Sequence, residues 1–436
     1  MSERLTSEEL QDCWPVLSCG ERVEAFEHMA RADSDDFFMA LGPRDQAELL
    51  SSMSEGDRRS MLRLLPPDDA ADVVQQLAPK ERHGLLGALD ESARHEVSAL
   101  LAYADDAAGG LMSPRFARLR PEMTVIEAIH YLKAQAKEHV ETIYNAYVVD
   151  PDQRLLGVVS FRDLVSVPAE RSIGDVMRKD LVSVPDTMDQ ESVARLMQQH
   201  DLNAIPVVDA QGRIKGIVTV DDIVEVVQQA ATEDIQKLGG MESLDTPYLQ
   251  TPMLAMVRKR AGWLSALFLG ELLTASAMGS FEDEIAKAVV LALFVPLIIS
   301  SGGNSGSQAT TLIIRAMALG EVKLGDWWRI MRRELSAGVM LGLILAVLGI
   351  TRIMIWQQIF HTYGEHALPV ALTVAVSLVG IVTWGTLAGS MLPFVIRRLG
   401  FDPASASAPF VATLVDVSGL VIYFSVAQVI LRGSLL

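Results

Sequence analysis

Apolar residues are concentrated in the second part of this chain. Five apolar segments follow residue 260, at about 261–280, 288–319, 335–356, 368–396 and 409–431. Each meets or exceeds the roughly 20 residues that a helix needs to cross a bilayer. The pattern therefore predicts a membrane domain of five transmembrane helices over residues 261–436.

A repeat with a period of twelve residues precedes these segments. Residues 42–101 form five consecutive blocks, from GPRDQAELLSSM to DESARHEVSALL. Each block has a helix-start residue near its beginning and apolar residues three or four positions apart at its end. Short helices of this kind bury their apolar faces by stacking on one another, which predicts a helical superhelix over residues 1–108.

A second repeat, of mixed type, follows the first. GLMSPRFARLRPEMTVIEAIHYL, from Gly110, aligns with DVMRKDLVSVPDTMDQESVARLM, from Asp175, and YVVDPDQRLLGVVSFRDL, from Tyr147, aligns with PVVDAQGRIKGIVTVDDI, from Pro206. Each copy is typical of a helix, two short β-branched strands around a polar turn, and another helix. The repeat resembles a tandem pair of CBS domains, which we expect over residues 109–228.

The end of each copy carries the pattern Gly-apolar-apolar-Ser/Thr-x-x-Asp. In CBS domains this pattern is often the place that holds an adenosine ribose. The resemblance therefore makes Asp163 and Thr219 candidate ligands of ATP or another adenine nucleotide. Residues 229–260 then predict a largely helical connection to the membrane domain.

The charges that flank the apolar segments predict the orientation in the membrane. Basic clusters precede the first segment (258–260) and lie between the second and third (329–333) and between the fourth and fifth (397–398), whereas the loops FEDEIAK and QQIFHTYGEH are poor in Lys and Arg. Basic loops stay inside. The polar N-terminus, MSERLTSEEL, lacks the apolar stretch of a signal peptide. We expect cytosolic N-terminal domains and an external C-terminus, in the cytoplasmic membrane.

The net charge of −18 is confined to the first 260 residues, because residues 261–436 hold ten Lys/Arg and ten Asp/Glu. So acidic a region repels phosphate backbones and attracts cations, which argues against a nucleic-acid partner. The two cysteines, Cys13 and Cys19, have no metal-binding spacing, and we interpret them as reduced and structural.

A polar stretch, IISSGGNSGSQATTLIIR, interrupts the second apolar segment at residues 298–315. Polar sequence at membrane depth is tolerated only against protein or a water-filled path. Asn304, Ser305 and Gln308 are accordingly candidates to line such a path. For the glycines and serines, close helix packing of the Gly-x-x-x-Gly kind is an equally good explanation.

Two acidic residues lie inside the apolar segments. Asp416 is flanked by PFVATLV and VSGLVIYFSVAQ, with no basic residue within a helical turn or two. A carboxylate at this depth costs roughly 2.5–3.5 kcal/mol on insertion scales, and such acids usually face a pathway; a protonated structural aspartate is the alternative. Two copies of Asp416 facing each other would need a hard cation between them, with Ala412 as a further oxygen donor. Glu271, central in the first segment, either lines the path or bonds a neighbouring helix.

The whole chain resembles the MgtE family of magnesium channels and transporters. The resemblance rests on PLIISSGGNSGSQATTLIIRA from Pro296, MLPFVIRRLGFDP from Met391, PFVATLVDVSGLVIYFSVA from Pro409, and ATEDIQKL from Ala231. It implies a non-enzymatic homodimer in the lipid bilayer, with a superhelical N-domain, a CBS pair, a connecting helix and five spans per subunit. It also implies that Asp416, in a Thr-x-x-Asp pattern with Thr413, binds Mg²⁺ at the dimer axis.

The same resemblance implies that acidic sites bind cytosolic Mg²⁺ and close the pore. These positions are Asp222, Glu225, Glu233, Asp234 and Asp402. Two departures from the family pattern stand out. Residues 228–230 read QQA where glutamates are common, and Ala408 replaces a frequent asparagine.

Two other functions stay open at this stage. One is an adenine-nucleotide-sensing membrane receptor whose spans do not conduct, and the other is a proton-coupled carrier of Co²⁺ or Mn²⁺ with Glu271 as its proton site. Oxygen ligands bind Mg²⁺, Co²⁺, Ni²⁺ and Mn²⁺ alike, so the sequence does not predict selectivity among them.

Overall fold

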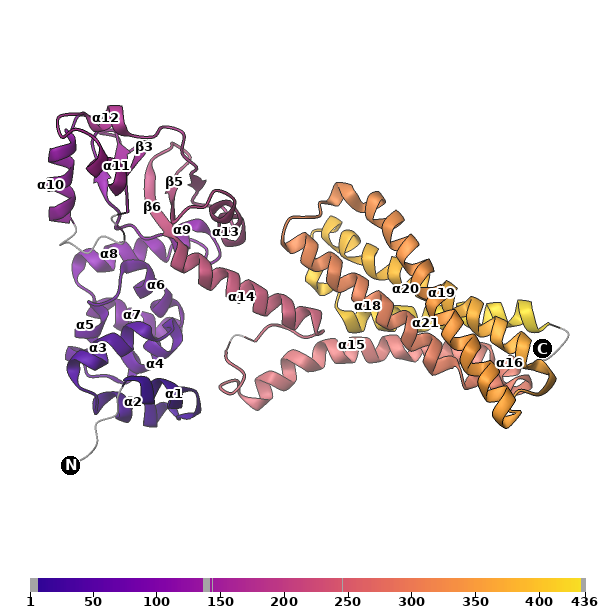
Figure 1. Cartoon of the computed structure of the whole chain (residues 1–436). Helices are drawn as coiled ribbons and strands as arrows, with labels where there is room; N and C mark the ends of the chain where they lie inside the picture. The colour runs from indigo at the N-terminus through magenta and orange to yellow at the C-terminus, as the bar shows by residue number, and fades with distance from the viewer. Residues whose placement is uncertain (1–6, 136–141, 143, 245, 433–436) are drawn as a thin grey trace. The chain divides into compact units, whose positions relative to one another are not determined.

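The structure is a computed structural model that describes residues 7–135, 142, 144–244 and 246–432 (Figure 1). The chain divides into two compact units, Met1–Ala230 and Ala231–Leu436. The first unit contains all the β-strands of the described residues, and the second is helical.

The first unit begins with a stack of short helices. They are α1 (Ser7–Cys13), α2 (Cys19–Glu27), α3 (Arg31–Ala40), α4 (Pro43–Ser52), α5 (Glu55–Leu62), α6 (Pro67–Gln75), α7 (Pro79–Ala88) and α8 (Glu91–Leu100). The twelve-residue blocks each contain one helix, α4 to α8, as predicted. Proline opens three of these five helices, and Ser54 and Asp90 cap the other two by accepting hydrogen bonds from the backbone amides of Asp57 and Ala93.

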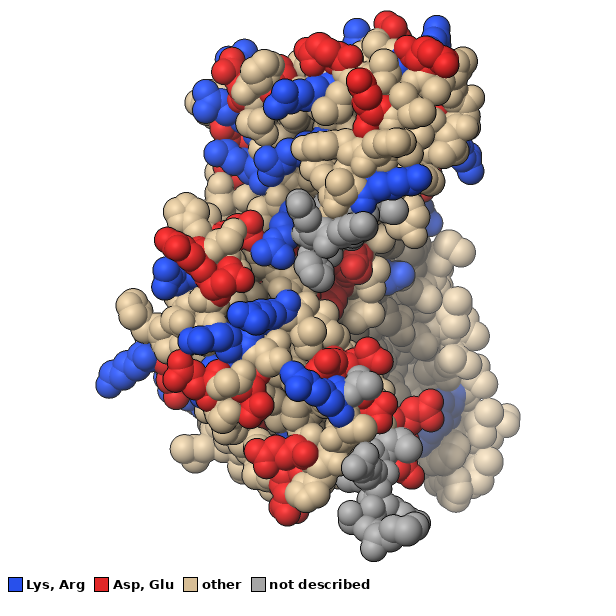
Figure 2. Space-filling model, turned by 90° about the vertical axis from the view of Figure 1, so that its left-hand side faces the viewer, with Lys and Arg blue, Asp and Glu red and all other residues tan. Residues whose placement is uncertain are grey.

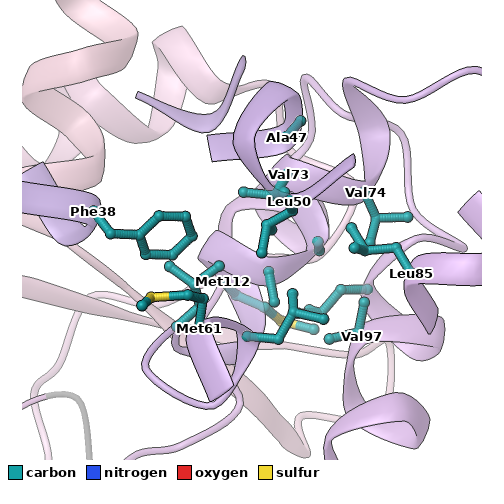
Figure 3. Close-up of a cluster of buried hydrophobic side chains, with 14 of the residues drawn as sticks. Phe38, Ala47, Leu50, Met61, Val73, Val74, Leu85, Val97 and Met112 are labelled. Carbon is teal, nitrogen blue, oxygen red and sulfur yellow. The ribbon is translucent and has the colours of Figure 1, made fainter. Parts of the chain in front are cut away.

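The apolar faces of these helices form a single buried core. Figure 3 shows Phe38, Leu50, Val73 and Val97 converging from α3, α4, α6 and α8, with Met112 joining them from beyond the stack. The same cluster continues into the second CBS repeat, through residues such as Val184, Val193, Ile205 and Val218. The superhelix and the second repeat therefore share one core.

The two CBS repeats form two three-stranded sheets of the same topology. In each sheet a short strand pairs in parallel with the first strand of an antiparallel hairpin, in the orders β1-β2-β3 and β4-β5-β6. The strands are β1 (Arg118–Leu119), β2 (Asn145–Val149), β3 (Leu155–Ser160), β4 (Val184–Pro185), β5 (Ala204–Val208) and β6 (Ile214–Thr219). The accompanying helices are α9 (Ala108–Leu111), α10 (Val125–Gln135), α11 (Phe161–Ser166), α12 (Ile173–Val176) and α13 (Gln190–Gln199). The sequence predicted the hairpins, but β1 and β4 are too short to show a period.

Two glycines allow the repeats to interlock. A Cβ atom on Gly157 would lie 2.7 Å from the carbonyl oxygen of Arg178, and one on Gly216 would lie 2.7 Å from that of Ser113. The start of the second repeat therefore crosses the hairpin of the first, and the start of the first crosses the hairpin of the second. The glycine of each Gly-apolar-apolar-Ser/Thr-x-x-Asp pattern is thus needed for packing.

The connection to the membrane domain is not one helix. Helix α14 (Val220–Leu238) ends at a glycine pair in which Gly240 has a φ of +73°. Such a left-handed residue is a usual helix stop. The next helix, α15 (Met253–Ser280), starts ahead of the basic cluster at 258–260 and continues into the first apolar segment.

Within residues 231–244 and 246–432, the second unit contains five helices long and apolar enough to cross a membrane. The five are α15, α18 (Val295–Ala318), α19 (Trp327–Phe360), α20 (Ala367–Arg398) and α21 (Ala408–Leu431). Two short helices, α16 (Glu282–Lys287) and α17 (Val289–Ala292), lie between α15 and α18. Helix α20 packs against α18, α19 and α21. Helix α15 packs along α21 and has no buried residue in a single chain. The prediction of five transmembrane helices is confirmed.

Candidate ion path and acidic clusters

The polar stretch of residues 298–315 is helical throughout, and one of its faces is a packing surface. Gly302 and Gly306 of α18 meet Gly385 and Gly389 of α20 so closely that Cβ atoms on the latter two would lie 2.3 and 2.1 Å from carbonyl oxygens of α18. On this face the buried hydroxyl of Ser305 lies 2.6 Å from that of Thr386. Of the two explanations that the sequence left open for Ser305, its position in the α18–α20 contact agrees with close helix packing.

The opposite face of α18 is a stripe of exposed polar side chains. Ser300, Asn304 and Gln308 are exposed in a single chain, and the amide of Asn304 donates to the hydroxyl of Ser300 at 3.4 Å. These positions are four residues apart and so share one side of the helix. Because hydrocarbon cannot hydrogen-bond to them, this polar stripe requires water or a second protein surface.

Asp416 of α21 faces α18 near this stripe. A Cβ atom on Gly303 would lie 3.5 Å from Ala412 and 3.7 Å from the Oδ1 atom of Asp416. One turn further along, the hydroxyl of Ser307 donates to the carbonyl oxygen of Ala408 at 3.2 Å. The lack of a side chain at position 303 thus brings the backbone of α18 up to the intramembrane carboxyl group.

A second carboxyl group, that of Glu271, lies within hydrogen-bonding reach of Asp416. Helix α15 carries Glu271 and approaches α21 at Gly270, where a Cβ atom would lie 2.7 Å from the methyl group of Thr413. A cavity of about 810 Å³ opens between the two helices, and Glu271, Ala412 and Thr413 are among the residues that line it. The structure thus brings together four predicted site residues from two helices.

Within the described part of the chain, no three His, Cys, Asp or Glu residues are arranged to hold a metal ion. The intramembrane pair supplies two carboxyl groups per chain. Carboxylate oxygens suit hard ions such as Mg²⁺, which keeps several waters and takes few protein ligands. The two carboxyl groups therefore fit a hydrated Mg²⁺ ion that keeps most of its water.

In the second unit, an ammonium group joins two of the predicted sensor residues. The Nζ atom of Lys237 lies 2.5 Å from Oε1 of Glu233 and 2.6 Å from Oδ2 of Asp402. Burial alone would lower the pKa of Lys237, but its hydrogen bonds with Asp402 and Glu233 outweigh that effect and raise the pKa above its ordinary value. A cation therefore already stands between these carboxylates. Asp234, also predicted, is the next residue of α14 after Glu233.

In the first unit, Asp222 and Glu225 lie close to acidic residues that the sequence did not single out. Burial raises the pKa of Asp72 to about 7, with contributions from the charges of Asp69, Asp222, Glu225 and Asp105. Burial likewise raises the pKa of Asp222 to about 7, against the effect of its hydrogen bonds from Thr219. We call these five residues the acidic cluster.

The sequence analysis did not select Asp69 and Asp72, because acidic residues are common in the first turns of helices, where they interact favourably with the positive end of the helix dipole. PPDDAAD therefore reads as an ordinary helix start. Only the fold brings α6 up to the start of α14.

The two candidate nucleotide ligands have structural roles as helix caps. Ser160 donates from its hydroxyl to Oδ2 of Asp163 at 2.7 Å, and Thr219 does the same to Oδ2 of Asp222 at 2.7 Å. The first pair is a capping box, and in the second the backbone amide of Thr219 also donates to Oδ2 of Asp222 at 3.1 Å, which explains the Ser/Thr-x-x-Asp spacing without a ligand. The Oδ1 atom of each aspartate takes no part in the cap.

A helical superhelix, an interlocked CBS pair and five apolar helices with a polar stripe beside a carboxyl pair define a multi-pass membrane transport protein, and not an enzyme. Family comparison agrees. A model described as a divalent cation transporter, MgtE, matches residues 295–426, the MgtE intracellular N domain matches residues 5–106, and CBS domains match residues 108–170 and 173–229. The chain belongs to the MgtE family.

Two relatives that match more than three quarters of this chain support this assignment. The chain is 43% identical to a magnesium transporter, MgtE, of Thermus thermophilus, over 79% of this chain and 74% of the relative. It is 34% identical to the MgtE of Enterococcus faecalis, over 77% and 72% of the two chains. Among solved structures, the cytosolic domain of the Mg²⁺ channel MgtE in complex with ATP is 38% identical, with a TM-score of 0.48, and covers 51% of this chain and 91% of that one.

Proposed function

We propose that this protein is a homodimeric channel that admits Mg²⁺ passively across the cytoplasmic membrane and closes when cytosolic Mg²⁺ binds its acidic residues. The observation that carries the proposal is the polar stripe of α18, exposed in one chain, beside the carboxyl pair of Asp416 and Glu271. Family membership supports magnesium as the transported ion.

The carboxyl pair argues for a cation at this depth. Two like charges side by side in a region of low dielectric repel strongly, so the pair must share a proton or bind a cation. In a dimer with Asp416 near its axis, four carboxyl groups would surround the path. Helix α15, which is unburied in one chain, is the element that a second copy would cover.

The polar stripe fits an ion that keeps its water. Mg²⁺ loses its hydration shell reluctantly, so a pore for it should offer hydrogen-bonding groups to bound water. Ser300, Asn304 and Gln308 offer both donors and acceptors along about two turns of α18. The side chains therefore suit passage of a largely hydrated ion.

Gating follows from repulsion between carboxylates. Without Mg²⁺, the carboxylates of the acidic cluster repel one another, as do Glu233 and Asp402 wherever Lys237 does not join them. A divalent ion would bridge them and draw their elements together. We propose that this bridging closes the pore, with Asp234 contributing beside Glu233.

The charge pattern supports an orientation with cytosolic N-terminal domains. The basic residues at 258–260, 329–333 and 397–398 all lie at ends of spans that would face the same side. Since five spans place the two termini on opposite sides, the C-terminus would be external.

Uptake into liposomes with an enclosed Mg²⁺-sensitive dye tests the pore. We expect Asp416→Ala and Asp416→Asn to abolish uptake, because neither retains the intramembrane charge. Glu365→Gln, which removes a carboxylate from a loop between spans, should behave as the unmodified protein. Normal uptake by Asp416→Ala would refute the assignment of Asp416 to the pore.

Electrical recording separates a channel from a proton-coupled carrier. We expect Mg²⁺ currents above carrier turnover that do not depend on a proton gradient. They should decrease as Mg²⁺ is raised to millimolar concentrations on the side of the N-terminal domains. Currents that stay constant as Mg²⁺ is raised on this side would refute the gating proposal, but they would not contradict the pore assignment.

We propose that the CBS pair binds an adenine nucleotide through Asp163 and Thr219. The Oδ1 atom of Asp163 takes no part in the helix cap. Calorimetric titration of the full chain with ATP tests this. We expect saturable heat that Asp163→Ala abolishes, and an absence of heat would refute the site.

A further inference from the structure

A cavity of about 640 Å³ lies in the first unit between the helical stack and the first CBS repeat. Its walls come from α5, the start of α8, the segment that leads into β1, and α10. It is separate from the carboxyl pair, from the acidic cluster and from Asp163. Cavities of this size hold small organic ligands.

The cavity is basic, although the unit around it is strongly acidic. Arg59, Arg63, Arg115 and Arg118 line it, against two carboxylates, those of Asp90 and Glu96. Figure 2 shows that basic and acidic side chains are interspersed over this side of the unit, so the excess of arginines is a property of the cavity.

Both carboxylates already have partners. Asp90 caps α8 by accepting the backbone amide of Ala93 at 2.8 Å. Glu96 accepts from the Nη2 and Nε atoms of Arg115 at 2.8 and 3.0 Å. Glu96 therefore pairs with Arg115, and it interacts with Arg118 only through its charge.

Two of the arginines have no ion pair. Within the described residues, neither Arg63 nor Arg118 has a carboxylate oxygen within 4.0 Å. Arg118 makes only long hydrogen bonds, of 3.4 and 3.5 Å, to Gln153 and to the carbonyl oxygen of Pro114. Its guanidinium group stacks 4.5 Å from the ring centroid of Phe116, and desolvation lowers its pKa. The stacking holds this group in place while leaving its donors available.

We propose that this cavity binds a small anion that carries a diphosphate or triphosphate group, with Arg63 and Arg118 as its main ligands. Guanidinium groups pair with phosphate through two parallel hydrogen bonds, which gives both strength and geometry. Two separated guanidinium groups suit two phosphates better than one.

Binding would join two parts of the first unit. Arg63 follows α5 of the helical stack, whereas Arg118 belongs to β1 of the first CBS sheet. A polyphosphate between them would oppose separation of the stack from this sheet. A ligand in this cavity would therefore act on the same unit that contains the acidic cluster.

Calorimetric titration of the full chain in detergent with pyrophosphate, in EDTA, tests the proposal. Pyrophosphate has no ribose and so does not report on Asp163. We expect one site per chain. Arg63→Gln and Arg118→Gln should each weaken binding about tenfold or more, because each removes a charge-assisted hydrogen-bond donor. Arg44→Gln, which removes an exposed arginine of α4 outside the cavity, is the matched control and should bind as the unmodified protein.

Each other result would overturn the proposal. These results are no heat with pyrophosphate, equal weakening by Arg44→Gln, or loss of binding in Asp163→Ala but not in the two cavity variants. Arg63 is exposed and makes no ion pair with the described residues, so its substitution should leave the thermal unfolding temperature unchanged. The Arg63→Gln result therefore stands even if Arg118→Gln is unstable. Mg²⁺ uptake by the same variants is measured separately, so failure of this site does not bear on the pore.

Discussion

Replacing Lys237 by methionine tests whether its ammonium group occupies a Mg²⁺ site. The group lies 2.5 Å from Glu233 and 2.6 Å from Asp402, and 28% of its side chain is exposed, against 41% and 39% for its partners. Exposed ion pairs of this kind contribute about 0.2–1 kcal/mol each, so their loss should affect folding little. Methionine keeps the length of the side chain and removes the charge.

The effect on Mg²⁺ binding should be larger. A unit charge roughly 4 Å from a divalent ion opposes binding by about 2 kcal/mol in water, and salt reduces this to about 1–2 kcal/mol. In Lys237→Met, two carboxylates are left to face the ion without this competitor. We therefore expect Mg²⁺ to bind about fivefold to thirtyfold more tightly at this site.

The assay is a titration of Mg²⁺ on the side of the N-terminal domains during current recording. The concentration that halves the current should fall by the same factor in Lys237→Met. Lys237→Arg, which keeps the charge, should resemble the unmodified protein, as should Lys179→Met, which removes an exposed lysine of the first unit. An unchanged or higher half-inhibitory concentration in Lys237→Met would refute this reasoning.

Three further predictions concern the acidic cluster, the helix contact and the carboxyl pair. Because the pKa values of Asp72 and Asp222 rise from 3.8 to about 7 on folding, these two groups contribute stability that is fully present below about pH 4 and is lost as pH rises through 7. Without Mg²⁺, the thermal unfolding temperature should therefore depend less on pH over this range in Asp72→Asn than in the unmodified protein. Gly389→Ala should lower the stability by about 1–3 kcal/mol, because its Cβ atom would lie 2.1 Å from the Gly306 oxygen, whereas Gly262→Ala, with open space around it, should not. Glu271→Gln should slow Mg²⁺ uptake into liposomes severalfold without abolishing it, because Asp416 keeps its charge; uptake at the normal rate would show that Glu271 does not act on the ion.

The sequence predicted the elements whose signals are local and repeated. The twelve-residue period gave α4 to α8, and the internal repeat gave the β-hairpins of both CBS copies. The five spans followed from length and hydropathy alone. The connection over residues 229–260 contains a break that the sequence analysis did not predict, because Gly239 and Gly240 end α14.

Contacts between distant residues could not be predicted in the same way. Asp72 lies near Asp222 because the helical stack and the second CBS repeat share a core. No local sequence pattern predicts this shared core. The proximity of Glu271 to Asp416 likewise depends on how α15 lies along α21. The sequence left two roles open for Glu271, and the structure joins them, because its bond to a neighbouring helix is made to the candidate pore residue itself.

In the polar stretch of α18, residue type alone does not predict which side of the helix each polar residue lies on. Asn304 and Ser305 are adjacent and both polar, so the sequence made both candidates for the path, with close helix packing as an equally good explanation for Ser305. Successive residues of a helix are about 100° apart, however, and residue 305 falls on the side of Gly302 and Gly306, which meets α20. Residue 304 falls on the side of Ser300 and Gln308. The polar stretch of residues 298–315 therefore has two different sides. Small residues on one side hold α20 close, while two amides and a hydroxyl on the other side are exposed in a single chain.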